Sequence, residues 1–320
     1  MEIHAQHRAV VDAPKPATPS EQAHRSKLRG IGCMLVAVGA FAFMDSLLKF
    51  LTEHYPTMQV SAMRGFASLP FVLLPLVFRR SFAELKPVRW KLHLMRGLLS
   101  VFLLATFVYA IRVLSLADAY SIFLSAPLLV TALSVPILGE KVGWHRWFAI
   151  GIGLCGVIVM LRPSTSSLMT VGALAAFVSA IAYAVSVVSV RVLLKTESNT
   201  SVVFWSMLIM TLVSAAFALG DWQPIRVEHY GVIVATGVLG AIAVHLLTLA
   251  YRSAPVSTIA PFEYTALLWG VGIDWLAWNT LPDTRVYTGG GIVVLSGLYL
   301  IWRESRQRIE PARSLEKIVS

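Results

Sequence analysis

The sequence predicts an all-α integral membrane protein with ten transmembrane helices, which form two inverted five-helix repeats around a central cavity. Hydrophobic residues make up 57% of the 320 residues and charged residues only 14%, whereas soluble proteins carry about 25% charged residues. The apolar residues form long blocks, each near the roughly 20 residues that cross a bilayer. Backbone groups in lipid must be satisfied within the protein, and these blocks are too long for barrel strands, so we expect helices.

The apolar blocks define ten predicted spans, each bounded to within a few residues. The spans cover residues 30–51, 57–78, 91–112, 116–138, 144–161, 168–190, 200–219, 229–251, 255–277 and 286–302. Residues 1–29 lack the apolar core of a signal peptide and contain Pro and polar residues, which predicts a disordered cytoplasmic tail. Residues 304–320 are expected to form a basic cytoplasmic tail.

The loop charges predict the orientation. With the N-terminus in the cytoplasm, the inner segments hold 18 Lys and Arg residues and the outer segments hold 4. This asymmetry follows the positive-inside rule for a multi-pass protein of the inner (cell) membrane with both termini in the cytoplasm. The same placement explains the net charge of +10 by topology, so we expect no nucleic-acid partner.

An internal repeat appears when the sequence is compared with itself at the offset that places Gly32 on Gly172. The same offset matches Ala40 with Ala180, Ser46 with Ser186 and Arg112 with Arg252. A common offset across several spans indicates a duplication, with repeats over 30–163 and 168–303. Five spans per repeat is an odd number, so the second repeat is expected to be inverted, as in many secondary transporters.

Four segments resemble the drug/metabolite transporter superfamily, EamA branch. They are Phe41–Lys49, Leu116–Ala119, Leu138–Val142 and Ala260–Tyr264, and the resemblance covers about residues 30–303. It implies a ten-helix fold with a central cavity that moves amino acids, amines, nucleotide-like compounds or vitamins, with export the commoner activity. The sequence departs from the pattern at Asn279-Thr280, where Gly-Glu is frequent, and at Ser115, where Pro is common.

Charged residues inside the spans are the first candidates for function, because a charge in lipid costs about 2.5–3.5 kcal/mol on insertion scales. Asp45 and Arg64 fall at similar depth in the outer half, roughly 10 Å from the outer end of their spans, and can pair. Lys49 lies one helical turn from Asp45, and Asp118 opens span 4. The alternative is a structural ion-pair network, or rim charges that reach water.

A second polar group lies in the inner half. His245, Glu263 and Tyr183 are expected at similar depth in spans 8, 9 and 6. A carboxylate beside a histidine can exchange protons near neutral pH, which suggests proton coupling or recognition of a substrate amine. The alternative is a satisfied polar pair that holds helices together.

Tyr109 and Tyr264 are further candidates, because an intramembrane Tyr needs a hydrogen-bond partner and can stack on a planar or cationic solute. Packing is the alternative for both. Gly151–Gly156 matches a dinucleotide-binding pattern, but it lies inside an apolar span, where small residues allow close helix packing. The sequence has no phosphate-binding loop and no metal-ligand spacing, so we expect no cofactor and no metal.

Together these patterns predict a secondary transporter, not an enzyme, that moves a small polar metabolite by alternating access. An amino acid or amine-like solute and export are favoured. An importer of a planar metabolite such as riboflavin or a nucleoside-like compound is the first alternative, and an intramembrane enzyme or a receptor or scaffold is the second. The expected partners are the solute, the lipid bilayer and a coupling proton, and the chain is expected to be a monomer or homodimer.

Overall fold

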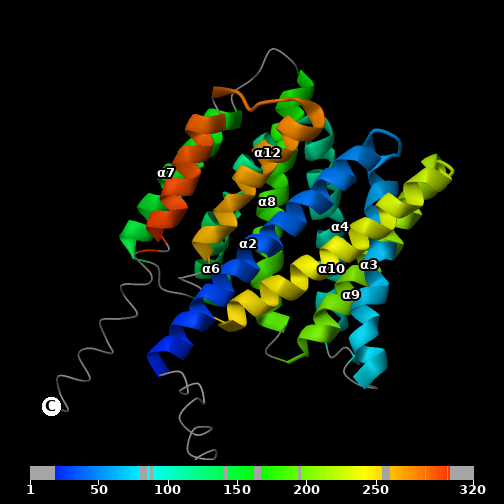
Figure 1. Ribbon diagram of the computed structural model, residues 1–320, viewed down its shortest axis with the longest axis horizontal. Helices are drawn as coiled ribbons and strands as arrows, with labels where there is room; N and C mark the ends of the chain where they lie inside the picture. The colour runs from blue at the N-terminus through cyan, green and yellow to red at the C-terminus, as the bar shows by residue number, and fades with distance from the viewer. Residues whose placement is uncertain are drawn as a thin grey trace, which may run out of the picture.

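The computed structural model describes residues 19–79, 85–86, 89–139, 143–161, 167–193, 196–253, 260–284, 286–300 and 302. Within these residues the regular secondary structure is entirely helical (Figure 1), as expected. Residues 1–18 of the predicted N-terminal tail and the whole predicted C-terminal tail, 304–320, lie outside the described residues. So do residues 255–259 of the ninth predicted span and residues 140–142 of one motif.

Helix occupies the described part of each predicted span, except at Leu124 and Ser125 in span 4. The first half contains α2 (Pro19–Thr52), α3 (Thr57–Arg79), α4 (Trp90–Val113), α5 (Leu116–Phe123), α6 (Ala126–Leu138) and α7 (Trp144–Leu161). The second half contains α8 (Ser167–Leu193), α9 (Asn199–Ala218), the 3₁₀ turns η2 (Leu219–Asp221) and η3 (Val227–His229), α10 (Tyr230–Ser253), η4 (Ala260–Thr265), α12 (Ala266–Trp278) and a helix over Val286–Leu300.

Six helical segments of the described chain are long and apolar enough to cross a membrane. They are Arg25–Thr52, Trp90–Val113, Leu116–Ile137, Val171–Val190, Thr200–Asp221 and Val227–Ala250. Two shorter apolar helices cover Trp144–Met160 and Val286–Leu300. The chain is therefore a membrane protein by helix length and composition.

Helix boundaries repeat along the chain at the offset seen in the sequence. That offset carries the first residue of α4, Trp90, onto the first residue of α10, Tyr230. It also carries the first residue of α6 onto the first residue of α12. These coincidences of structure are independent of residue identity, so they support a duplication.

The first helix is longer than expected. Because α2 begins at Pro19, the predicted disordered tail of residues 1–29 is wrong for residues 19–29.

Two spans that the sequence predicts as continuous helices are interrupted. Span 4 divides into α5 and α6 at Leu124 and Ser125, because Pro127 has no N–H for the carbonyl of Phe123 and its ring clashes with that carbonyl. In span 9, the 3₁₀ turn η4 precedes α12 and carries Pro261 near its start. Each of these regions departs from regular α-helix beside a proline.

Helices of the two halves interleave. The long helices α2 and α10 pack along each other, α4 packs on α8 and α9, and α3 packs on α9 and α10 (Figure 1). Small residues allow this close approach: a Cβ at Gly97 of α4 would lie 2.4 Å from Ile209 of α9, and one at Gly237 of α10 would lie 2.3 Å from the backbone of Ala67. Each of these helix pairs is thus shared between the halves.

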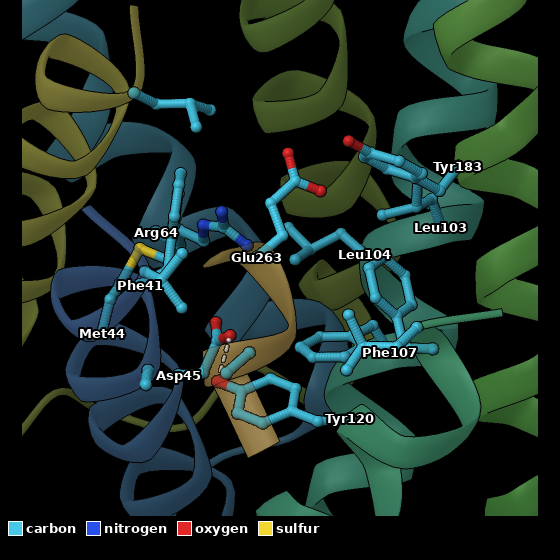
Figure 2. Close-up of a pocket in the computed structure, with 16 residues that line it drawn as sticks. Phe41, Met44, Asp45, Arg64, Leu103, Leu104, Phe107, Tyr120, Tyr183 and Glu263 are labelled. Atoms are coloured by element: carbon cyan, nitrogen blue, oxygen red, sulfur yellow. Dashed lines mark hydrogen bonds between the residues drawn. The ribbon is translucent and has the colours of Figure 1, made fainter. Parts of the chain in front are cut away.

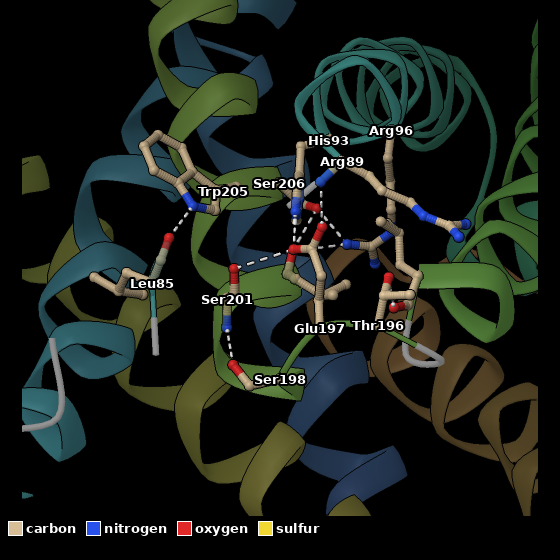
Figure 3. A network of polar contacts seen from close by, with 12 residues as sticks. Leu85, Arg89, His93, Arg96, Thr196, Glu197, Ser198, Ser201, Trp205 and Ser206 are labelled. Atoms are coloured by element: carbon tan, nitrogen blue, oxygen red, sulfur yellow. Dashed lines mark hydrogen bonds and ion pairs between the residues drawn. The ribbon is translucent and has the colours of Figure 1, made fainter. Parts of the chain in front are cut away.

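A network of polar contacts links the start of α4 to the connection between α8 and α9 (Figure 3). The Glu197 carboxylate pairs with the His93 ring and accepts a hydrogen bond from the Arg89 backbone N–H at 2.8 Å. Arg96 donates to the Val202 carbonyl at 2.9 Å. These contacts cross from one half to the other, so they fix the relative positions of helices that also bound the cavities.

Candidate functional site

A cavity of about 300 Å³ lies between the two halves (Figure 2). Its walls come from α2, α3, α4 and α5 of the first half and from α8, α10, η4 and α12 of the second half. The polar side chains of its lining are Asp45, Arg64, Tyr120, Tyr183 and Glu263. Four of the eight candidate residues therefore meet in one cavity, although they come from four separate elements.

Asp45 is buried and has a defined partner. The Tyr120 hydroxyl donates a hydrogen bond to Asp45 Oδ2 at 2.8 Å, and Arg64 interacts electrostatically with the same carboxylate. In Figure 2 the Arg64 guanidinium points into the space between the carboxylates of Asp45 and Glu263. The expected proximity of Asp45 and Arg64 is therefore seen, with Tyr120 as an additional partner.

Glu263 enters the cavity from η4. The absence of regular helix around it lets the side chain extend into the lining, where the Tyr183 hydroxyl points toward its carboxylate (Figure 2). Phe123, the last residue of α5, and Leu124 of the interruption between α5 and α6 also line the cavity. Both interruptions of helix thus face the cavity, which is the pattern of binding sites built on discontinuous membrane helices.

Aromatic rings form the remaining wall. Phe107 stacks with Tyr120, with centroids 6.3 Å apart and an interplanar angle of 22°. Phe123 meets Phe107 edge-on at 5.2 Å and Tyr183 edge-on at 5.4 Å. The cavity therefore combines two carboxylates and one guanidinium with an apolar aromatic surface.

A second cavity of about 430 Å³ adjoins the first, and we call it the vestibule. Phe41 and Arg64 belong to both linings. His245 lines the vestibule and Glu263 lines the first cavity, so the expected inner group of His245 and Glu263 is divided between two compartments. Sequence depth alone placed them together, because it does not report which way a helix face points.

Three candidates lie outside the described linings of both cavities. Tyr109 is half-buried in α4. Asp118 lies in the first turn of α5, where its N–H donates to Ser115 Oγ at 3.0 Å. Tyr264 is buried in a cluster with Val157, Ala176 and other apolar side chains.

Lys49 has a partner that sequence reasoning missed. Its Nζ lies 3.3 Å from Asp274 Oδ1 of α12, and Asp274 Oδ2 accepts a hydrogen bond from the Ala117 N–H at 2.8 Å. Asp118 interacts electrostatically with both Lys49 and Asp274. Asp274 is an acid inside a predicted span, so the rule that singled out Asp45 would also have found it.

Tyr120 lines the cavity but was not among the sequence candidates. Its signal in the sequence is its position inside the predicted span 116–138, where an intramembrane hydroxyl needs a partner. Sequence alone did not identify Asp45 as that partner, because 75 residues separate them.

A bundle of apolar helices in two related halves, with a charged cavity between them, defines the class of small-solute membrane transporters. The chain belongs to the EamA-like transporter family, whose model matches residues 28–162 and again residues 170–303. The predicted resemblance to the EamA branch of the drug/metabolite transporters is thereby confirmed, and so is the presence of two repeats.

Curated relatives are similar over nearly the whole chain. The S-adenosylmethionine uptake transporter of Rickettsia felis is 26% identical over 283 residues, covering 88% of this chain and 95% of the relative. The pseudopaline exporter CntI of Pseudomonas aeruginosa is 25% identical, with 84% and 95% covered. The riboflavin transporter of Vibrio cholerae is 28% identical, with 88% and 96% covered.

A solved crystal structure has the same fold. It superposes with a TM-score of 0.59 at 17% sequence identity, and covers 88% of this chain and 99% of its own. At this identity the similarity concerns the fold alone.

Proposed function

We propose that this transporter is a secondary carrier that exports a small polar metabolite, an amino acid or amine-like solute, by alternating access. The observation that carries the proposal is the cavity itself, since Asp45, Arg64 and Glu263 bring charges of both signs to one space between the halves. Charges at this depth are costly to bury, and a solute with complementary charges offsets that cost while it is bound.

The architecture we propose is ten membrane-crossing helices in two inverted repeats, over 30–163 and 168–303. The matching first residues of α4 and α10 support the duplication. An inner-membrane location with both termini in the cytoplasm follows from the loop charges. Two related halves around one cavity permit the alternating exposure that a carrier needs.

A second candidate function is uptake of a planar metabolite such as a flavin or nucleoside-like compound. The stacked pair of Phe107 and Tyr120 favours it, because the rings offer a flat apolar surface beside the charges. Among the relatives, one is named a riboflavin transporter and one an S-adenosylmethionine uptake transporter. The test must therefore distinguish uptake of the solute from its export.

The test uses the purified protein. A thermal-shift screen against metabolite pools identifies stabilising solutes, and flux of each hit is then measured in both directions in proteoliposomes. Glu263→Gln is expected to lower flux at least tenfold and to alter its pH dependence, since the variant removes an ionisable group from the cavity. Glu228→Gln, an exposed residue of η3, is the matched control. Unchanged flux and unchanged pH dependence in Glu263→Gln would refute a role for this carboxylate.

A further inference from the structure

The vestibule and the central cavity have opposite charge character. In the described lining of the central cavity, the carboxylates of Asp45 and Glu263 outnumber the guanidinium of Arg64. In the described lining of the vestibule, Arg64 and His245 are the ionisable groups, and no carboxylate is present. Among these described residues, Arg64 is the one that carries a charge in both compartments.

The vestibule otherwise offers hydroxyl groups and apolar surface. Ser68, Thr200 and Thr248 contribute hydroxyl oxygens, and the remaining lining is largely aliphatic. Thr200 lies near the start of α9 and Thr248 near the end of α10, which are cytoplasmic ends in the predicted orientation. The vestibule thus extends from Arg64 toward the cytoplasmic side.

We propose that the vestibule is a second solute subsite that receives a carboxylate, and that Arg64 binds this carboxylate at the junction while Asp45 and Glu263 hold the cationic group of the same solute in the central cavity. The solute class is therefore an amino-carboxylate whose two charges lie on either side of Arg64. The assignment of the two charges to one solute rests on the proposed transport function, whereas the charge selectivity of each compartment does not.

The physical basis is the low dielectric constant of the protein interior. A single guanidinium at about 10 Å, with an effective dielectric constant near 20, changes the local concentration of a monovalent ion by roughly tenfold. The described lining of the vestibule contains no carboxylate, so the carboxylates that oppose the field of Arg64 there are those of Asp45 and Glu263, across the junction in the lining of the central cavity. In the central cavity, the two carboxylates of Asp45 and Glu263 outweigh the guanidinium of Arg64 and make the local electrostatic potential negative.

Charge-selective thiol labelling tests the proposal without a known substrate. The native thiols Cys33 and Cys155 are replaced by Ala, and one cysteine is placed in each compartment, Val203→Cys in the vestibule and Leu103→Cys in the central cavity. The purified full chain is treated with sulfonatoethyl and trimethylammonioethyl methanethiosulfonate, and both rates are normalised to a small free thiol. Leu212→Cys, at a side chain that is 55% exposed on α9, is the control.

The expected ratio of anionic to cationic labelling is about tenfold higher at Val203→Cys than at Leu103→Cys. Adding Arg64→Gln should lower the ratio at Val203→Cys at least threefold, and Arg64→Lys should preserve it. Sodium propionate should slow labelling at Val203→Cys, and propylammonium chloride should slow it at Leu103→Cys.

Three results would overturn the proposal. They are equal ratios at the two positions, a vestibule ratio that does not respond to Arg64→Gln, and failure of both reagents to modify Val203→Cys. Absence of protection by propionate would overturn the carboxylate subsite. Failure of solute flux in proteoliposomes would instead overturn the proposed function and would leave the labelling ratios as they are.

Discussion

Lys49 and Asp274 form a buried ion pair, with Nζ 3.3 Å from Oδ1, that joins the first helix of the first half to α12 of the second half. The Asp274 side chain is fully buried, and its other carboxylate oxygen accepts the Ala117 N–H at the start of α5. The Lys49 ammonium also lies 4.6 Å from the centroid of the Trp278 ring, which is a cation–π contact. One pair of side chains therefore ties three elements together beside the cavity.

Breaking this pair on one side should destabilise the protein. Lys49→Met leaves the Asp274 carboxylate buried without its counter-charge, which costs about 3–5 kcal/mol. The double variant Lys49→Met/Asp274→Leu removes both charges and should lose less than the sum of the single variants. The apparent Tm of the purified protein in detergent gives the comparison, and strictly additive losses would contradict a direct interaction.

Tyr120 and Tyr264 should respond differently to loss of their hydroxyl groups. Tyr120→Phe leaves Asp45 without its hydrogen-bond donor, at a cost of about 1–3 kcal/mol, and should weaken binding of the solute. The Tyr264 hydroxyl is buried and has no hydrogen-bond partner among the described residues, so Tyr264→Phe should be neutral or slightly stabilising. Unfolding temperatures of the two variants measure the contrast, and equal losses would argue against it.

Two glycines of the Gly151–Gly156 motif should differ in their tolerance of alanine. A Cβ at Gly156 would lie 2.7 Å from the carbonyl oxygen of Gly289 in the helix over Val286–Leu300. Because this oxygen belongs to the backbone, Gly156→Ala should cost about 1–3 kcal/mol through overpacking.

At Gly151 nothing lies within 4 Å of an added Cβ, so Gly151→Ala is the matched control and should be tolerated. The comparison of unfolding temperatures tests the interpretation of the motif as a helix-packing surface. A greater loss in Gly151→Ala than in Gly156→Ala would be the opposite of this expectation.

The features that the sequence predicted well are those that depend on composition and period. Apolar blocks of membrane length became helices, and the offset between the repeats reappeared in the first residues of α4 and α10. The depth of Asp45 and Arg64 in neighbouring spans was enough to predict that they lie close together. Such properties are local, or follow from the length of a helix, and they need no knowledge of which helices touch.

The rest depends on contacts between distant segments. Lys49 and Asp274 are 225 residues apart, and depth alone paired Lys49 with Asp45 on its own helix. Glu263 and His245 were expected at one depth, but the 3₁₀ turn η4 directs Glu263 to a different cavity. Helix rotation and broken turns set these positions, and hydropathy reports neither.

Solute counterflow in proteoliposomes tests the central claim most directly. Vesicles that contain the purified protein are loaded with an unlabelled hit from the thermal-shift screen, ion gradients are dissipated with ionophores, and labelled solute is added outside. The account predicts transient, saturable accumulation of label in vesicles with the wild-type protein, strongly reduced by Asp45→Asn and absent from protein-free vesicles. Label entry equal to that of protein-free vesicles, for every solute that stabilises the protein, would contradict it.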